Sequence, residues 1–272
     1  MLFFSKKLNF LCFRPYCQKL LLGVRERNVP CALLPGTSDI WLRDFMPVRT
    51  KSGKWISFRY EPSYLDKTPE LRTDFKKQVA PQLNLDVTYS DINLDGGNIV
   101  FSPSRQRVLI SDRIFGENQD REPTVLIREL EKLLEAQVII IPSLKTDFTG
   151  HADGMVRFVD EYSAIGNHTG TKNGLEQRIK KVLKCHGINV IDFPYYASKS
   201  ISAEGCYLNF LETENCIFLP VFGRKDEDVK AIAAARQIFT KEIIPVEISA
   251  IAREGGGLNC ISWECDNSEC RQ

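Results

Sequence analysis

Five side chains in this sequence are of types that support nucleophilic chemistry, and each stands beside a glycine or proline turn. They are Cys260, His151, Asp44, Asp95 and Asp153. The cysteine comes three residues after a run of three glycines, a turn that permits positive φ angles and the close approach of a ligand. We expect this thiol at the rim of a strand, partly exposed, where a thiolate can attack a bound molecule.

Each of these residues has a plainer interpretation when it is taken alone. Asp44 is then a turn residue paired with Arg43. His151 is then an ordinary loop histidine, and Cys260 a buried thiol. Their occurrence together, at regular spacing, is what favours a catalytic role.

The elements that must position these side chains recur along the chain in the order strand, strand, helix, strand. Turn residues, acidic helix starts and β-branched closing strands support this assignment. Four such units are expected, with elements at 45–50, 55–59, 70–79 and 85–89; at 98–101, 108–111, 123–134 and 137–141; at 155–159, 163–166, 175–185 and 189–193; and at 207–211, 217–221, 226–239 and 244–248.

A polar residue lies at or just before the first strand of each unit and recurs at a nearly constant interval. The intervals are 51, 56, 58 and 51 residues along the series Asp44, Asp95, His151, Asn209 and Cys260. A period of this size indicates an array of similar supersecondary units.

A fifth unit begins at Cys260 but is cut short. A helix expected at 16–27 and a strand expected at 30–34 would supply its missing elements. The two ends of the chain would then close a ring, and the five polar residues would meet at one centre. We therefore expect residues 1–272 to form a single catalytic domain.

Composition and charge exclude several classes of partner. The chain is 43% hydrophobic and 26% charged, with a net charge of +1, so no global charge attracts nucleic acid or a membrane surface. The apolar runs near the N-terminus are broken by charged residues and Pro15, and are too short for a signal peptide or a membrane span. We expect a cytoplasmic protein, and the sequence leaves room for a homo-oligomer.

The nine cysteines are scattered, and most are expected to be buried free thiols. Neither a CxxC pair nor a paired histidine accompanies them, so no metal site is predicted. Cys265 or Cys270 could form a disulfide in an oxidising sample.

Four motifs in this order resemble those of the agmatine deiminase and Porphyromonas-type peptidylarginine deiminase family. They are WLRD followed by a proline, a carboxylate before GG, HxD, and GGGxxC, spread over roughly residues 18–263. The family belongs to the guanidino-group-modifying superfamily. The resemblance implies an α/β pentein fold, a five-fold pseudo-symmetric propeller of ββαβ units.

The resemblance also implies roles for individual residues. Cys260 matches the nucleophile and His151 the general acid and base, while Asp44 and Asp153 match the carboxylates that bind a guanidinium. Asp95 stands where the family has an acidic residue before GG, and is expected to orient His151 or to share in binding.

Two further residues are candidates for substrate binding. Asn209, in CYLNF, resembles an asparagine of the family, and Trp41 is expected in the core or against the alkyl chain of the substrate. Arg59 and the run 60–64 are weaker candidates for binding a substrate carboxylate.

The sequence departs from the family pattern at three places. Asp95 is one methylene shorter than the glutamate that many agmatine deiminases have, and Asn259 stands where many have a histidine. The N-terminal segment is also short. These differences concern the substrate more than the type of reaction.

The implied reaction is hydrolysis of a guanidinium to a ureido group and ammonia through a Cys-bound amidino intermediate. A guanidinium stays protonated and presents a planar fork of N–H donors, which carboxylates bind in bidentate fashion. A free thiol has a pKa of about 8.5, which flanking carboxylates raise and a bound cation lowers. We therefore expect Cys260 to react mainly in the substrate complex, without a metal or an organic cofactor.

Several functions remain open at this point. The first is deimination of agmatine or a similar small guanidine, which gives N-carbamoylputrescine for putrescine biosynthesis. The second is deimination of peptidylarginine or free arginine to citrulline. Amidino transfer to an amine shares the first half-reaction, and a non-catalytic pentein that binds a ribosomal subunit needs neither thiol nor histidine. A papain-like cysteine hydrolase fits the repeats and the surplus of carboxylates poorly.

Overall fold

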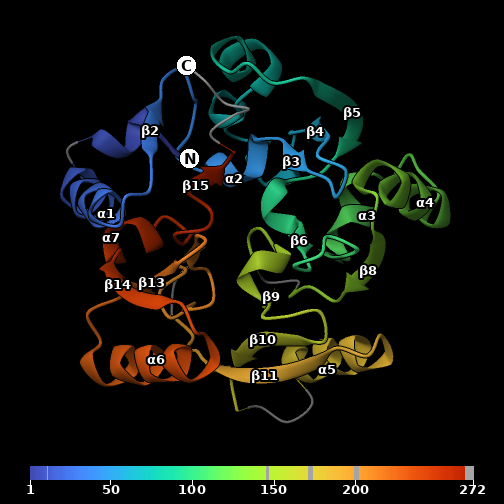
Figure 1. The fold of residues 1–272 in the computed structure, drawn as a ribbon. Coiled ribbons are helices and arrows are strands. Elements are labelled where there is room, and N and C mark those ends of the chain that lie inside the picture. Colours follow the sequence, from blue (N-terminus) through green and yellow to red (C-terminus); the bar gives the residue numbers. More distant parts are fainter. Residues whose placement is uncertain (11, 145–146, 171–173, 199–201, 267–272) are drawn as a thin grey trace. The chain divides into compact units, whose positions relative to one another are not determined.

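The structure is a computed structural model that describes residues 1–10, 12–144, 147–170, 174–198 and 202–266 (Figure 1). The strands of these residues form five three-stranded sheets. The chain divides into two compact parts. The first part comprises Met1–Arg43, Glu70–Leu85 and Pro194–Gln272, and the second comprises Asp44–Pro69 and Asp86–Phe193.

Each sheet of the second part places a helix or a set of helical turns between its second and third strands. The strands are β3 (Val48–Arg49), β4 (Trp55–Arg59) and β5 (Val87–Asn93); β6 (Val100–Phe101), β7 (Arg107–Ser111) and β8 (Gln137–Ile141); and β9 (Val156–Phe158), β10 (Ser163–His168) and β11 (Asn189–Pro194). Between second and third strands lie α3 (Arg113–Glu117) and α4 (Pro123–Leu134), after β7, and α5 (Leu175–Cys185), after β10. A short helix, α2 (Leu42–Phe45), begins in the first part and precedes β3.

The predicted pattern is clearest in the sheet of β6, β7 and β8. β6 and β7 pair antiparallel, and β7 and β8 pair parallel across α4. The helix begins with Pro123, whose missing N–H costs nothing at a helix start, and Glu122 caps it by accepting the N–H of Val125 at 2.9 Å. Its apolar face buries Leu126, Leu130 and Leu134, which belong to the core around β7 and β8.

The first part contains two sheets. One consists of β12 (Leu211–Glu212), β13 (Cys216–Val221) and β14 (Glu242–Glu247), with α6 (Lys225–Ile238) between β13 and β14. The other consists of β15 (Ser262–Glu264), β1 (Leu2–Ser5) and β2 (Cys31–Leu34), with α1 (Arg14–Glu26) between β1 and β2 (Figure 1). A short helix, α7 (Ser249–Ala252), precedes the glycine run.

The sheet of β15, β1 and β2 completes the fifth unit with N-terminal elements, as the sequence predicts. β1 pairs antiparallel with β15 and parallel with β2. The sequence pattern does not predict β1, although all four of its residues are buried and Phe3 packs against Trp263 with ring centroids 5.5 Å apart. The fold therefore has the predicted α/β units.

One predicted helix is wrong. The stretch 70–79 was expected to be a single helix, but the chain forms short turns there: η2 (Ser63–Leu65), η3 (Pro69–Leu71), η4 (Phe75–Val79) and η5 (Ala80–Gln82). The stretch is interrupted at Asp74, whose backbone is extended and whose side chain accepts the N–H of Lys77 at 3.1 Å, so a new helical turn begins at Phe75.

The first strands of the units are shorter than predicted. Helical turns occupy their starts: α2 before β3, η6 (Gly96–Asn98) before β6, and η7 (Ala152–Gly154) before β9. One further turn, η1 (Lys6–Asn9), follows β1. These turns carry the candidate site residues Asp44 and Asp153. The backbone there turns tightly and positions these side chains instead of extending the strand.

The cysteines differ in part from the expectation of buried thiols. Cys17, Cys206 and Cys216 are buried and free, whereas Cys12 and Cys185 are exposed. Cys265 is disulfide-bonded, and Cys270 lies outside the described residues.

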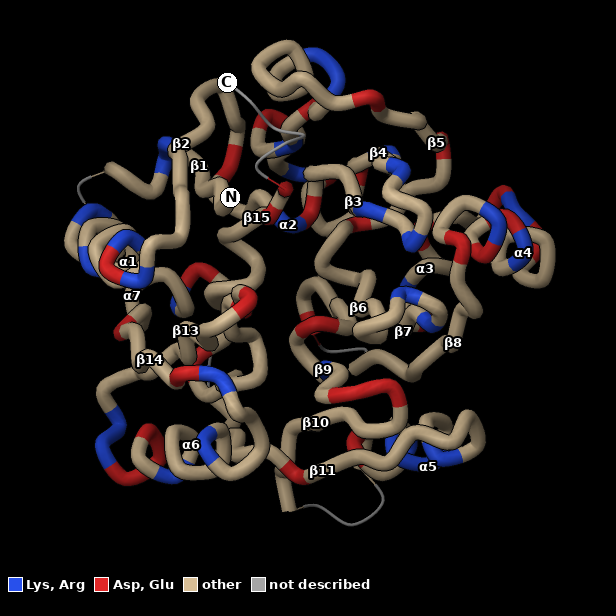
Figure 2. Tube along the Cα trace, viewed as in Figure 1, with Lys and Arg blue, Asp and Glu red and all other residues tan. Residues whose placement is uncertain are grey.

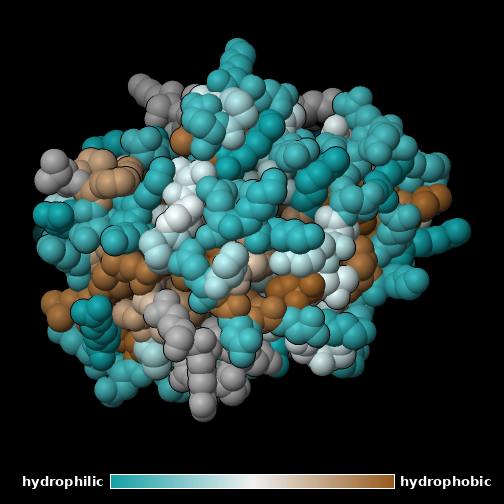
Figure 3. Space-filling model, turned by 90° about the horizontal axis from the view of Figure 1, so that it is seen from above, coloured by the Kyte–Doolittle hydropathy of each residue, from teal (hydrophilic) through white to brown (hydrophobic). Residues whose placement is uncertain are grey.

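The charge pattern differs between the helices. Basic and acidic residues alternate on α4, whereas α5 carries four basic residues, Arg178, Lys180, Lys181 and Lys184, beside the acidic Glu176 (Figure 2). The face shown in Figure 3 is mainly hydrophilic, with hydrophobic residues in smaller areas. None of the helices in the described residues is both long and apolar enough to cross a membrane.

Candidate active site

His151 lies between two carboxylates in the second part. Its Nε2 is 2.7 Å from Oδ2 of Asp95, and its Nδ1 is 3.5 Å from Oδ1 of Asp44. All three side chains are buried, with 6–7% of their residue surface exposed. Since each ring nitrogen faces an acceptor, the arrangement favours an imidazolium that carries a proton on both nitrogens.

The electrostatics of this cluster favour charge on the histidine. Burial opposes the charge, but Asp44 and the hydrogen-bonded Asp95 outweigh it and raise the pKa of His151 to about 9. Burial also raises the pKa of Asp44 to about 7, against the opposing charge of His151 and with the help of Asp95. The cluster therefore holds more carboxylates than it can keep charged without a further cation.

Asp153 belongs to the same cluster. It lies in η7, two residues after His151, and only 3% of its surface is exposed. Its charge contributes to the raised pKa values of His151 and Asp44. The structure thus brings together four of the predicted site residues, namely Asp44, Asp95, His151 and Asp153.

Gly97 is what allows Asp44 and His151 to approach. Its N–H donates to Oδ1 of Asp44 at 3.1 Å. A Cβ atom at this position would lie 2.6 Å from that oxygen and 2.7 Å from Nδ1 of His151, so no side chain fits. The second glycine of the DGG motif is therefore needed for Asp44 and His151 to pack against this turn.

Asn98 anchors the loop that carries His151. Its Oδ1 accepts the N–H of Ser111 at the end of β7 at 2.9 Å and the N–H of Ala152 at 3.2 Å. The side chain is buried, so these bonds are shielded from water. The loop is thereby fixed to the β7 strand, one residue after the histidine.

Tyr64 completes the cluster, a position that the sequence pattern does not predict. Its hydroxyl donates to Oδ2 of Asp95 at 3.0 Å, and burial keeps its pKa far above the usual value, so it remains a donor. Its ring lies edge-on to His151 with centroids 6.1 Å apart, and Phe148 packs against it at 5.0 Å. The only signal in the sequence is the aromatic run after β4, which does not specify this partner.

The glycine run and Cys260 lie in the first part, in the turn that precedes β15. Cys260 is half-buried and stands two residues before the strand, as predicted. Oδ1 of Asn209 accepts the N–H groups of Asn259 at 3.1 Å and Cys260 at 3.4 Å, and it lies 3.4 Å from the Cys260 Sγ. Asn209, predicted to bind substrate, therefore supports the turn of the thiol.

The three glycines have different roles. Only Gly255 has a positive φ, of 107°. A Cβ atom on Gly256 would lie 2.3 Å from the ring of Trp41, and one on Gly257 would lie 2.5 Å from Oδ1 of Asn209. The sequence predicts that a ligand approaches these glycines closely. At two of them, protein side chains occupy that space instead.

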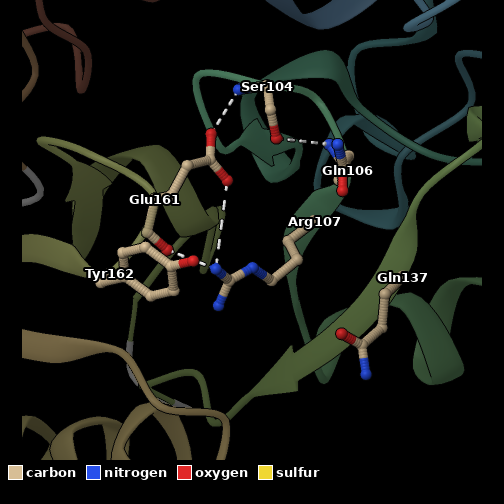
Figure 4. Close-up of a pocket in the computed structure, with 6 residues that line it drawn as sticks. All are labelled: Ser104, Gln106, Arg107, Gln137, Glu161 and Tyr162. Carbon is tan, nitrogen blue, oxygen red and sulfur yellow. Dashed lines mark hydrogen bonds and ion pairs between the residues drawn. The ribbon is translucent and has the colours of Figure 1, made fainter.

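A separate cavity of about 330 Å³ lies in the second part and contains none of the predicted site residues. Its lining consists of Ser104, Gln106, Arg107, Gln137, Glu161 and Tyr162 (Figure 4). Arg107 points toward Glu161 and Tyr162, and its guanidinium donates to the carbonyl oxygens of Glu161 at 2.5 Å and His186 at 3.3 Å. Its cation is thus already engaged by the protein.

No group of three or more histidine, cysteine or acidic side chains suited to a metal ion occurs in the part of the chain that the structure describes. The histidine and the three carboxylates of the cluster offer acid–base chemistry and binding of an organic cation. The thiol of Cys260 offers a nucleophile.

Comparison with known proteins agrees with this chemistry. The model of the Porphyromonas-type peptidyl-arginine deiminase family matches residues 18–265. No curated protein matches the chain by sequence.

Solved structures share the fold at low sequence identity. A C. jejuni agmatine deiminase with substrate bound is 19% identical with a TM-score of 0.70, covering 96% of this chain and 92% of that chain. A putative arginine deiminase from Porphyromonas gingivalis is 18% identical with a TM-score of 0.71, covering 93% and 84%. An Enterococcus faecalis agmatine deiminase is 17% identical with a TM-score of 0.68, covering 90% and 80%. The fold is therefore of the pentein type.

Proposed function

Because the chain belongs to the Porphyromonas-type peptidyl-arginine deiminase family and is thus an enzyme that acts on guanidino groups, we propose that it deiminates agmatine or a similar small guanidine. The observation that carries this proposal is the buried cluster of one histidine and three carboxylates around His151. Its excess negative charge is unfavourable in a buried site unless a cation binds there. A guanidinium is such a cation.

Asp44 and Asp153 would bind the planar N–H fork of the guanidinium. Binding of the cation keeps Asp44 ionised, although burial alone raises its pKa to about 7. Trp41 would contact the alkyl chain of the substrate. We propose that residues 1–272 act as one catalytic domain in this reaction.

In the first half-reaction, the Cys260 thiolate forms a bond to the guanidinium carbon. His151, charged because its pKa is raised to about 9, donates a proton to the departing nitrogen. The C–N bond breaks and ammonia leaves. The carbon remains bound to the sulfur as an amidino-thio intermediate, and His151 is now neutral.

In the second half-reaction, neutral His151 accepts a proton from water, and the hydroxide attacks the same carbon. The C–S bond breaks, Cys260 leaves as a thiolate, and the hydroxyl proton of the new ureido group passes to solvent, where ammonia takes it up as ammonium. The thiolate and the imidazolium are thus both regenerated. The product is a ureido group, N-carbamoylputrescine in the case of agmatine. Asp95 would hold the imidazole in place through its bond to Nε2. The residues would need no cofactor for either step.

A second candidate substrate is arginine, free or within a peptide. The description of the matching family favours it, since that family is named for peptidyl-arginine. Citrulline would then be the product. The catalytic steps are the same for both substrates, and only the contacts beyond the guanidinium differ.

The proposal is tested by incubating the purified protein with agmatine, free arginine and an arginyl peptide in parallel. Ammonia and ureido product are both measured, because hydrolysis gives both whereas transfer to an amine gives no ureido group. We expect equal amounts of the two products with one preferred substrate. The reaction should disappear in Cys260→Ala.

The matched control is Cys31→Ala, which removes another half-buried free thiol of the first part. This variant should retain the wild-type rate. If the folded wild-type protein turns over none of the three substrates and its mass shows no amidino adduct, the proposed reaction is wrong.

A further inference from the structure

The residue immediately before Asp44 binds the turn that carries Cys260. The N–H of Arg43 donates to the carbonyl oxygen of Cys260 at 3.0 Å, and its Nε donates to the carbonyl oxygen of Asn259 at 3.4 Å. Its two terminal nitrogens lie 3.3 and 2.5 Å from the carboxylate oxygens of Glu264. Backbone and side chain of one residue thus hold a segment of six residues, 259–264.

These contacts differ from those of an ordinary surface ion pair. The Arg43 side chain is only 14% exposed, and a two-nitrogen contact to a carboxylate fixes direction as well as distance. Glu264 is the last residue of β15 and is paired with Leu2 in β1, so the arginine connects the turn to an ordered strand. An isolated exposed pair would contribute little to order.

The turn is held from a second side by Asn209. Its Oδ1 accepts from the N–H groups of Asn259 and Cys260, while Arg43 donates to the carbonyl groups of the same two residues. The peptide groups on both sides of the Cys260 Cα therefore have fixed partners. This leaves the thiol with few ways to change its direction other than rotation about its own side-chain bond.

We propose that Arg43 is a positioning residue for the nucleophile: it acts through the Cys260 turn and does not itself contact substrate. The inference rests on the proposed function, in which the thiolate must attack a guanidinium carbon. Attack requires the reacting atoms to be held at about 3–3.5 Å with the correct approach, and a displacement of about 1 Å can cost about a hundredfold in rate. Releasing the turn should therefore lower kcat while leaving KM nearly unchanged.

The experiment compares Arg43→Gln, Glu264→Gln and the double variant with wild type. Arg27→Gln is the matched control, because Arg27 makes a similar two-nitrogen pair with Glu242 in the same part, at 2.9 and 3.5 Å. Two quantities are measured: amide hydrogen exchange of the peptide that covers 257–264, and the separate values of kcat and KM. The melting temperature of each variant is recorded to detect general destabilisation.

We expect amide exchange in 257–264 to become at least about tenfold faster in Arg43→Gln and Glu264→Gln, with unchanged exchange elsewhere. We expect kcat to fall about 10- to 100-fold, with KM within about threefold of wild type. In the double variant, kcat should be no lower and amide exchange no faster than in the more severe single variant, because both substitutions break the same contact between Arg43 and Glu264. Arg27→Gln should match wild type in both measurements.

Unchanged exchange in Arg43→Gln would overturn the proposed hold on the turn. Faster exchange with an unchanged kcat would overturn its role in positioning the thiol. Glu264→Gln keeps the test decisive should Arg43→Gln fold poorly, because the Glu264 side chain is 49% exposed. The exchange measurement does not depend on turnover. Absence of deiminase activity would disprove the proposed function, and the exchange rates would still test whether Arg43 holds residues 259–264.

Discussion

Nε2 of His151 lies 2.7 Å from Oδ2 of Asp95, and the hydroxyl of Tyr64 donates to that same oxygen at 3.0 Å. One carboxylate oxygen therefore links the histidine to the phenol of Tyr64. The orientation of the imidazole is fixed on this side, and its other nitrogen faces Asp44.

Protonated His151 should stabilise the folded protein up to alkaline pH. The pKa of His151 is about 9 in the folded protein and 6.5 in the unfolded chain, so its contribution is full below pH 6.5 and disappears as pH rises through 9. We expect the difference in unfolding free energy between wild type and His151→Asn to shrink by about 2 kcal/mol between about pH 7.5 and about pH 10. Urea unfolding at a series of pH values measures it. A difference that does not change with pH would disprove the shift.

Asp44 should release a proton when a guanidinium binds. Its pKa of about 7 in the free protein means that the carboxyl is partly protonated at neutral pH, and a bound cation favours the charged form. Calorimetry of agmatine binding to Cys260→Ala, in buffers of different ionisation enthalpy, should show release of a fraction of a proton near pH 7. The affinity should fall as pH drops below 7.

The same titration at about pH 8.5 serves as the control for Asp44. The carboxyl is already ionised there, so binding should release almost no proton. Equal proton release at both pH values would assign the proton to another group.

Tyr64→Phe should shift the alkaline limb of the activity profile upward. Wild-type kcat is expected to fall above about pH 9 as His151 loses its proton. Without the phenol, Asp95 concentrates its negative charge on His151 and raises the pKa of the imidazolium further. Stability should decrease by about 1 kcal/mol from the lost hydrogen bond. An identical pH profile in the variant would show that the hydroxyl only fills space.

Gly97→Ala should separate Asp44 from His151. The new methyl group would require both side chains to move, since it would lie 2.6 Å from one and 2.7 Å from the other. We expect activity to fall at least about a hundredfold and stability to fall by about 1–3 kcal/mol. Gly116→Ala is the control, because no atom lies within 4 Å of a Cβ there and its position in α3 favours alanine. Wild-type activity in Gly97→Ala would contradict the packing argument.

The sequence predicts best the elements whose signals are local. The helix α4 and the strand β8 have the predicted bounds, 123–134 and 137–141, because an apolar helical period and a β-branched run lie next to each other. The structure also brings together Asp44, Asp95, His151 and Asp153, each of which stands beside a glycine or proline turn in the sequence.

Features that depend on distant contacts were not predictable in the same way. Tyr64 and Asp95 are 31 positions apart, and nothing near Tyr64 in the sequence indicates which acceptor it will meet. The strand β1 was missed because four residues carry too little periodic signal, and its pairing with β15 spans nearly the whole chain. The turns of residues 63–82 show how a capping residue, Asp74, divides a stretch with a helical pattern.

The position of β1 between β15 and β2 has a consequence for the synthesis of the protein. The amino group of Met1 donates to the carbonyl oxygen of Cys265 at 2.7 Å, across a separation of 264 positions. Contacts between such distant segments form slowly, since a long loop must close first. A nascent chain can therefore pair β1 with β2 early, but the strand that follows Cys260 joins them only after the chain has been made as far as β15. The turn that carries the thiol is thus ordered after the rest of its sheet, and a chain that stops before β15 holds no positioned nucleophile.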